Sequence, residues 1–236
     1  MNLDVDYDHR LDSEGQDPDI RSPTLKLQHQ LLWSKPLPNG KLFELQPEPG
    51  RYLKHESHLG KFFLSSDTIS HSLRKQKRMQ AVIEQIPAKE LDELQTTGSV
   101  IGGRILFPGN RIDGQATINS ARGFNAKIND RFDLTLECIR LHYHGVSNPL
   151  DRALDRYSDF FRLFENFEGY VEFFLLQDLV SEKSSEVRFF LPHNPSFEGS
   201  PRPANVEEYM RYKANTTSFI EARNTRIRDW AAKNLT

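Results

Sequence analysis

The sequence contains a single cysteine among its 236 residues, and this scarcity excludes several classes of protein. Cys138 has no second thiol with which to form an intrachain disulfide, and a cysteine-based zinc site is impossible. No apolar run approaches the roughly 18–20 residues that span a bilayer. The N-terminal stretch MNLDVDYDHRLDSEG is acidic, so it lacks the apolar region of a signal peptide. We therefore expect a cytoplasmic protein that does not enter a membrane.

Familiar catalytic motifs are missing as well. The sequence has no phosphate-binding loop, no dinucleotide glycine fingerprint and no nucleophile elbow. HESH at 55–58 is close to the zinc-protease motif, but His55 and His58 are three residues apart where that motif needs four. We expect no metal site there. The formal net charge of −2 excludes a globally basic nucleic-acid-binding protein, although a local basic patch remains compatible with it.

The charged residues are unevenly distributed along the sequence. The first 20 residues carry seven acidic side chains against one basic side chain, Arg10: Asp4, Asp6, Asp8, Asp12, Glu14, Asp17 and Asp19. Basic residues concentrate at 74–78 and 223–228. Residues 1–22 are therefore interpreted as an acidic N-terminal arm.

The expected fold is a single α+β domain with a central mixed β-sheet flanked by helices and a long C-terminal helix. Helix and strand patterns follow one another without regular alternation, which favours α+β over a doubly wound fold. After the arm, an α+β core is predicted over 23–191. A proline-rich loop follows at 192–204, and the C-terminal helix is predicted to pack on the core from 205 to 236.

Local start signals predict the individual helices. Ser22 followed by Pro23 is typical of a helix start, and Asn205 with Glu208 resembles a capping box for the last helix. Asp67 is placed to cap a helix over 68–86. A further long helix is predicted over 118–145. YVEFFLLQ at 170–177 has the composition of a strand, or of a buried helix segment.

Three segments share one plan: KFFLSSD at 61–67, RILFPGN at 104–110 and RFFLPHN at 188–194. If they are parallel neighbours in one sheet, Asp67, Asn110 and Asn194 gather at the rim where ligands of open α/β sheets bind. His71, His193 and Arg122 would then lie close by. The alternative is that strands simply end in turns, which favour these residue types.

The predicted helix over 118–145 has a polar arc that includes Arg122, and this arc has the ordinary interpretation of a solvated face. Arg131 falls beside the apolar side instead. Because an unpaired buried guanidinium is costly, Arg131 is interpreted as half of an ion pair, as an anion-binding residue, or as evidence of a mistaken helix phase. Cys138 falls within the apolar arc, which favours inert packing over nucleophilic chemistry.

On the predicted helix over 68–86, cationic or titratable side chains share one face: His71, Arg74, Lys75 and Arg78. Cations in early helical turns oppose the helix dipole, which favours a negative partner nearby. That partner is either the protein's own acidic arm or a nucleotide or nucleic acid. A merely solvated face is the third interpretation.

Four stretches resemble an uncharacterised family of bacterial proteins known only as a domain of unknown function: SPTLKLQHQLLWSKPLPNG, FFLSSDTISHS, INSARGFNAKINDRFDLTLECIR and GYVEFFLLQDLV. The resemblance covers nearly the whole chain. It implies a bacterial, cytosolic origin and a single unit, and it supplies no catalytic residues.

Two functions are compatible with these observations. In the first, the protein binds a phosphate-bearing ligand, either a nucleotide or nucleic acid, and acts on it as a defence- or toxin-type enzyme. Asp67, His71 and His193 would then be the catalytic acid–base groups. Arg74, Arg78, Arg122 and Arg131 would hold the phosphate. In the second, the protein is a non-catalytic module that docks a protein partner or a second copy. The residues identify no cofactor.

Overall fold

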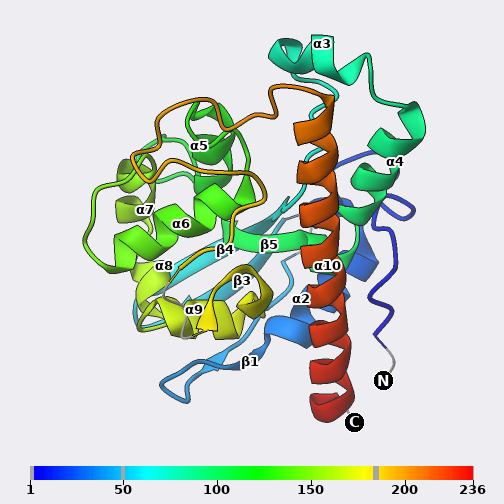
Figure 1. The fold of residues 1–236 in the computed structure, drawn as a ribbon. Helices are drawn as coiled ribbons and strands as arrows, with labels where there is room; N and C mark the ends of the chain where they lie inside the picture. The colour runs from blue at the N-terminus through cyan, green and yellow to red at the C-terminus, as the bar shows by residue number, and fades with distance from the viewer. Residues whose placement is uncertain (1–2, 49–50, 183–185, 236) are drawn as a thin grey trace.

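Five short strands form two antiparallel sheets in the computed structural model, which describes residues 3–48, 51–182 and 186–235. The strands are β1 (Lys35–Pro36), β2 (Leu42–Phe43), β3 (Leu53–Ser57), β4 (Gly60–Thr68) and β5 (Arg104–Pro108). β1 pairs with β2, and β4 lies between β3 and β5 in the second sheet (Figure 1). The α+β class is confirmed. The expected central mixed sheet is wrong, because both sheets are antiparallel.

The register of β4 and β5 overturns the predicted gathering of three strand ends. Asp67 lies opposite Ile105, whereas Asn110 lies beyond the opposite end of β5. The third segment, 188–194, forms no strand, and the pairing nearest to it is an isolated bridge between Val180 and Val187. Similar apolar composition predicts extended structure, but it does not determine strand direction, so the three segments share a composition and not a sheet.

The helices surround the three-stranded sheet, as Figure 1 shows. They are α1 (Pro18–Arg21), α2 (Pro23–Trp33), α3 (Gln80–Ile83), α4 (Ala88–Thr97), α5 (Ile118–Phe124), α6 (Phe132–Tyr143), α7 (Asp151–Arg156), α8 (Ser158–Arg162), α9 (Phe167–Phe173) and α10 (Val206–Asn234). Short 3-10 turns are η1 (Lys77–Met79), η2 (Ile101–Gly103) and η3 (Gln177–Leu179). None of the helices in these described ranges is long and apolar enough to cross a membrane.

Local capping signals are confirmed at two helices. The Ser22 side chain accepts a hydrogen bond from the Leu25 amide at the start of α2. The Asn205 side chain accepts one from the Glu208 amide, and the Glu208 carboxylate accepts one in return from the Ala204 amide. Both caps satisfy amides that have no partner within the helix. They are encoded within a few residues of sequence, which is why they could be predicted.

The predicted helix over 68–86 is wrong. β4 continues to Thr68, an irregular segment follows over 69–76, and only η1 and α3 are helical. The Asp67 carboxylate accepts hydrogen bonds from the adjacent Thr68 amide and from Arg122, so it caps no helix. Leu73 has a φ of +58°, which ends any regular helical path. The helix face predicted to carry His71, Arg74, Lys75 and Arg78 therefore does not exist.

The predicted helix over 118–145 is two helices, α5 and α6, separated by residues 125–131. Asn129 and Asp130 have φ values of +48° and +61°, a left-handed conformation that a continuous helix cannot contain and that Asn and Asp tolerate best. Arg122 fixes the break because its Nη2 donates to the Asp130 carbonyl oxygen at 2.7 Å. The polar arc calculated across this break is therefore wrong: Arg122 is fully buried, whereas Phe124 is 88% exposed.

The first half of YVEFFLLQ lies in α9 and no part of it is a strand, so its interpretation as a buried helix segment is confirmed for residues 170–173 and its interpretation as a strand is wrong. Phe173 and Phe174 join a cluster of rings with Trp33 and Phe164. These rings form an aromatic core between the helical layer and the sheet, to which several of the 16 phenylalanines contribute.

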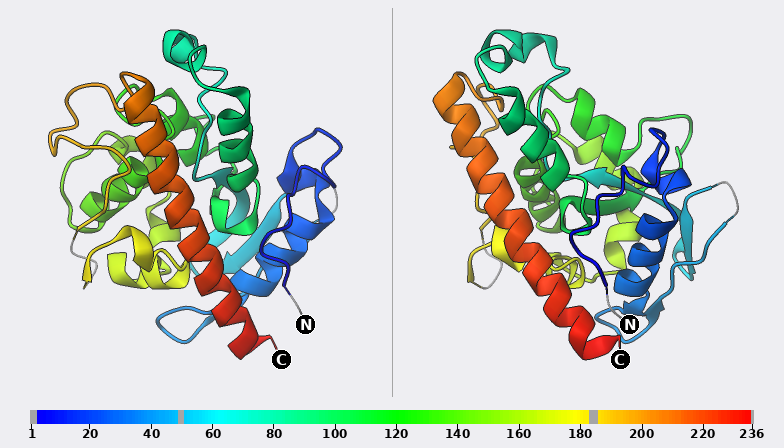
Figure 2. Two further views of the ribbon diagram at one scale, coloured as in Figure 1. Left: turned by 45° about the vertical axis from the view of Figure 1, so that its right-hand side comes forward. Right: turned by 90° about the vertical axis from the view of Figure 1, so that its right-hand side faces the viewer.

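Figure 2 shows α10 running the full length of the molecule, with the N-terminal arm beside α2 and α4. α10 contacts η2 closely: a Cβ on Gly102 would lie 2.1 Å from the Asn224 Oδ1 atom, which instead accepts a hydrogen bond from the Gly102 amide. Leu3 and Val5 of the arm are buried in the core. Residues 1 and 2 of the predicted arm and residue 236 of the predicted last helix lie outside the described residues.

Candidate functional site

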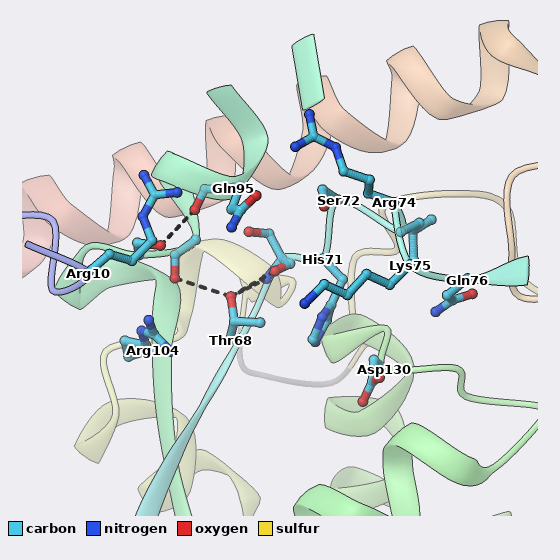
Figure 3. Close-up of a pocket in the computed structure, with 14 residues that line it drawn as sticks. Arg10, Thr68, His71, Ser72, Arg74, Lys75, Gln76, Gln95, Arg104 and Asp130 are labelled. Carbon is cyan, nitrogen blue, oxygen red and sulfur yellow. Dashed lines mark hydrogen bonds between the residues drawn. The ribbon is translucent and has the colours of Figure 1, made fainter. Parts of the chain in front are cut away.

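A cavity of about 430 Å³ opens beside the ends of β4 and β5 that meet at Thr68 and Arg104. Its wall contains side chains from the arm, from the irregular segment after β4, from β5 and from the break between α5 and α6 (Figure 3). Four of these side chains are cations and one is an acid: Arg10, Arg74, Lys75, Arg104 and Asp130. The wall is therefore electropositive, as the binding site of an anion would be.

Three of the residues predicted to form a site, Asp67, His71 and Arg122, meet behind the part of the wall formed by His71 and Asp130, which we call the inner end of the cavity. The buried Arg122 guanidinium donates to the Asp67 carboxylate at 2.6 Å. It also donates to the Thr135 hydroxyl at 3.1 Å and to the Asp130 carbonyl oxygen. Each of the three guanidinium nitrogens of Arg122 donates to a protein acceptor, so Arg122 has a structural role and no nitrogen is left for a ligand.

Arg131 and His193 lie elsewhere, and Arg131 is part of a structural ion pair. The Arg131 guanidinium pairs with the buried Asp133 carboxylate. It also donates to the carbonyl oxygens of Pro201 and Leu191, at 3.0 and 3.1 Å. His193 packs between the rings of Phe189 and Phe197. The ion-pair interpretation of Arg131 is confirmed, and neither Arg131 nor His193 joins His71 in the wall of one cavity.

The remaining predicted anion contacts differ in their surroundings. Arg74 lines the cavity but already pairs with Asp92 at 2.8 Å. Arg78 lies exposed in η1, away from the cavity wall. Lys75 lines the cavity and forms no ion pair or hydrogen bond with the described residues; in Figure 3 its side chain points toward His71. Of the predicted cationic face, Lys75 is thus the member that remains free for a ligand.

In the described chain, the acidic arm forms an ion pair with one cavity cation, Arg10, through Asp8. Other carboxylates of the arm have partners elsewhere, and Asp6 pairs with Arg228 on α10. The buried Asp19 carboxylate accepts hydrogen bonds from the Ser66 amide and hydroxyl, and burial raises its pKa to about 7. Sequence reasoning offered the arm as the internal partner of the basic residues. Its ion pairs in the described region leave Lys75 and Arg104 uncovered.

Arg104 is a candidate that sequence reasoning missed. It lies opposite Thr68 in the sheet, and its largely buried side chain reaches the cavity wall. Its Nε atom is buried without a hydrogen-bond partner, and no described acid forms an ion pair with the guanidinium. Burial lowers the pKa of Arg104, while Asp19 and other carboxylates act against this effect from a greater distance. The available signal was a cation inside the apolar run SVIGGRILF.

His71 is held with its ring buried near two acids. The Tyr212 hydroxyl accepts a hydrogen bond from the His71 amide at 3.2 Å, which fixes the backbone. The Nε2 atom of His71 is buried and has no hydrogen-bond partner among the residues described. Desolvation lowers the pKa of His71, and the nearby carboxylates of Asp67 and Asp130 oppose this effect only partly. The imidazole is therefore neutral near pH 7.

Asp130 is the second residue that sequence reasoning missed. Its carboxylate lines the cavity and accepts no hydrogen bond from any residue of the described chain, although its backbone is tied down on both sides. The Asp130 amide donates to the Arg122 carbonyl oxygen at 3.1 Å, and the Asp130 carbonyl accepts from Arg122. A left-handed residue held this firmly, with a free side chain facing a cavity, is typical of a functional position.

Two further residues singled out in the sequence have structural surroundings. His55 belongs to β3, stacks on Phe43 at 4.1 Å between ring centroids, and donates from Nδ1 to the Glu44 carbonyl oxygen. Cys138 is buried in α6, and desolvation raises the pKa of its thiol. The predicted inert packing of Cys138 is confirmed.

A second cavity, of about 480 Å³, contains an unusual lysine. The Lys35 Nζ atom lies 4.7–4.9 Å from the ring centroids of Trp33, Phe173 and Trp230. Burial lowers the pKa of Lys35 to about 7, with a smaller contribution from Arg223. The rings offset part of this desolvation through cation–π attraction, but no described carboxylate pairs with the ammonium group.

Lys35→Met should stabilise the protein at pH 6.5 by about 1–3 kcal/mol, because the folded wild type buries a charge that the unfolded chain exposes to water. The pKa of the lysine is about 7 when folded and 10.5 when unfolded, so this penalty is complete below pH 7. It diminishes as the pH rises toward 10.5, and the gain should be smaller at pH 9.5. Urea unfolding at both pH values measures it.

Exposed Lys41 provides the matched control, since Lys41→Met removes the same charge without removing a burial penalty. A Lys35→Met protein less stable than wild type at pH 6.5 would show that the aromatic cage outweighs desolvation.

The comparisons with known proteins concern family membership. A model described as a family of unknown function, DUF6994, matches residues 3–227. No curated protein and no solved structure matches the chain. The match covers the N-terminal arm, both sheets and most of α10, so it includes all the cavity residues described above. The chain therefore belongs to DUF6994, a family of unknown function.

Proposed function

We propose that this is a cytoplasmic protein that binds a phosphate-bearing small molecule, with a nucleotide as the preferred class, in the cavity beside Arg104. The observation that carries the proposal is the Arg104 guanidinium, which is largely buried at the cavity wall without an ion-pair partner in the described chain. An unpaired buried cation is costly, and a bound anion would remove that cost. A planar guanidinium suits phosphate because it donates two parallel hydrogen bonds.

The shape and charge of the cavity favour a small ligand over a nucleic-acid strand. A volume of about 430 Å³ falls within the ~300–1,000 Å³ typical of small-molecule sites. Lys75 adds a second cation without an ion-pair partner among the described residues, whereas Arg10 and Arg74 line the cavity but are paired with Asp8 and Asp92. The chain as a whole carries a net charge of −2, which favours a small ligand over the many phosphates of a nucleic-acid strand.

His71 is the acid–base group in this proposal if the protein is an enzyme of the defence or toxin type. Its ring lies in the cavity wall, and a neutral imidazole accepts a proton from a substrate or a water molecule. Asp67 acts indirectly, through Arg122, to shape the inner end. His193 has no part in it, because it lies with Arg131 outside the cavity wall.

Calorimetric titration with inorganic phosphate and with AMP tests the proposal. Arg104→Gln should weaken the binding of both by at least tenfold, because a charge-assisted hydrogen bond contributes about 1.5–3 kcal/mol. Arg78→Gln removes an exposed arginine outside the cavity wall and should leave both affinities unchanged. The absence of binding at millimolar concentration, or equal binding by Arg104→Gln, would overturn the proposal.

The interaction-module alternative is favoured by one different observation. Phe124 at the end of α5 is 88% exposed, which is unusual for so large an apolar side chain. In this alternative, α5 docks a protein partner or a second copy of the chain, and the cavity is not a ligand site. If neither phosphate nor AMP binds in the titration, the protein-interaction alternative is favoured.

A further inference from the structure

A cluster of potential metal ligands lies at the inner end of the cavity. Asp67, His71 and Asp130 each offer one ligand atom, and these atoms all lie within 4.8 Å of one another. They come from the end of β4, from the irregular segment that follows it, and from the break between α5 and α6. Such a set is not apparent from the sequence, because His71 and Asp130 lie 59 positions apart.

Two of the three ligand groups have no protein partner in the described chain. The Nε2 atom of His71 is buried and unpartnered, and the Asp130 carboxylate accepts no hydrogen bond. Buried polar atoms nearly always have a partner, so an orphaned nitrogen on an imidazole ring beside two carboxylates points to a missing one. The partner must accept the lone pair of a neutral imidazole and the charge of a carboxylate. A cation does both.

The third ligand, Asp67, is oriented by its neighbours. Its Oδ2 atom accepts from Arg122 and its Oδ1 atom from the Thr68 amide. Each carboxylate oxygen has a second lone pair, so these bonds orient the group without exhausting it, as outer-shell donors do at metal sites. Arg122 also compensates one of the two acidic charges. With a neutral His71, the cluster carries about one net negative charge.

From this geometry we infer that Asp67, His71 and Asp130 bind one divalent transition-metal ion of the Zn²⁺ or Mn²⁺ class. One imidazole nitrogen with two carboxylates suits these borderline metals better than Ca²⁺ or Mg²⁺, which take all-oxygen ligand sets. In a tetrahedral site with bonds of about 2.0–2.1 Å, ligand atoms lie roughly 3.3 Å apart. Small side-chain rotations would close the cluster to that spacing, and two of its three members, His71 and Asp130, line the cavity.

The proposal rests on the placement of the three groups, and the surroundings of His71 agree with it. Metal ligands must be deprotonated, and burial already lowers the pKa of His71. Facing groups on the other elements act in both directions: Asp67 and Asp130 raise the pKa, whereas Arg122 and Arg104 lower it. Because none of the three ligands is Arg104 or Lys75, the metal site does not rest on the proposed phosphate site, and with a metal bound His71 would be a ligand and not the acid–base group.

Titration of the full chain with Zn²⁺ alone, after treatment with a chelator, tests the site. Wild type should bind one ion per chain, and Asp130→Asn should weaken the affinity at least tenfold. Asn tolerates the left-handed backbone of position 130, and the Asp130 side chain makes no hydrogen bond in the described chain, so this variant should fold. Asp229→Asn, an exposed change on α10, is the matched control and should bind as wild type does.

Two further measurements keep the outcome clear. Co²⁺ bound in place of Zn²⁺ should show a visible absorption band that His71→Ala changes, since an imidazole ligand alters the ligand field. Arg104→Gln should keep metal binding while losing phosphate binding, which separates the two proposals. Equal Zn²⁺ affinity in wild type and Asp130→Asn, or binding without a defined one-to-one ratio, would identify adventitious histidine binding and overturn the inference.

Discussion

Replacing Arg223 by methionine should lower the free energy of unfolding by about 3–5 kcal/mol, a loss as large as breaking a buried ion pair. Arg223 on α10 is fully buried. Its guanidinium donates two hydrogen bonds to the Phe174 carbonyl oxygen, at 2.9 and 3.2 Å. It also donates to the carbonyl oxygens of Gly102 and Arg104, at 2.9 and 2.6 Å. Methionine fills similar space but leaves three buried carbonyl groups without a donor.

Arg223 has carbonyl oxygens around it where a carboxylate would be expected. Burial lowers its pKa, and the face of Trp33 lies 5.7 Å from its guanidinium carbon. Because its planar fork reaches η2, β5 and the end of α9 together, lysine should not replace it. Urea unfolding of Arg223→Met and Arg223→Lys measures the loss. Arg211→Met, on an exposed turn of the same helix, should stay within about 0.5 kcal/mol of wild type.

Arg131→Met should destabilise the protein by a similar amount, about 3–5 kcal/mol, because it leaves the buried Asp133 carboxylate without a counter-charge. Asp133→Asn should be costly for the converse reason. The double variant, Arg131→Met with Asp133→Asn, buries no charge, and the new amide oxygen can still accept from the Phe190 amide. Its loss should be smaller than the sum of the single losses by at least ~1.5 kcal/mol.

Urea unfolding of the four proteins completes this double-mutant cycle. Strictly additive losses would contradict the ion pair as the reason for Arg131's buried position. A folded Arg131→Met protein should also bind phosphate as wild type does, since Arg131 does not reach the cavity beside Arg104. The residue that most suggested a ligand in the sequence is thus expected to act on stability alone.

The parts of the fold that could be predicted are those encoded locally. Ser22, Pro23 and Asn205 mark helix starts through contacts within three residues, and the structure confirms both starts. Strand direction is different, because it depends on which distant segment pairs with which. The segments around Asp67 and Asn110 have the same composition and run in opposite directions.

The interruptions of the predicted helices could not be predicted from the sequence for a related reason. Asn129 and Asp130 can continue a helix or leave it, and the choice depends on Arg122 binding the Asp130 carbonyl oxygen. Asp67 offered a cap to a following helix, but a guanidinium 55 residues away holds its carboxylate instead. In both cases a tertiary contact overrides a local preference.

The candidate site could be predicted in outline only. Asp67, His71 and Arg122 were expected near one another, and the structure brings them together, although the parallel strand ends used to justify this do not exist. Arg104 and Asp130 carried no signal beyond a cation in an apolar run and an Asn–Asp pair. Their importance comes from what surrounds them, namely a cavity and missing partners.

The contact between α10 and η2 affects the folding reaction of the chain. The hydrogen bond between Gly102 and Asn224 joins residues 122 positions apart, and that between His71 and Tyr212 joins residues 141 apart. Contacts so distant in sequence form late and slow the folding reaction. At ~5–20 residues per second, a ribosome would release η2 roughly 6–25 seconds before Asn224. Until then, the apolar surface beneath α10 stays open to water and to chaperones.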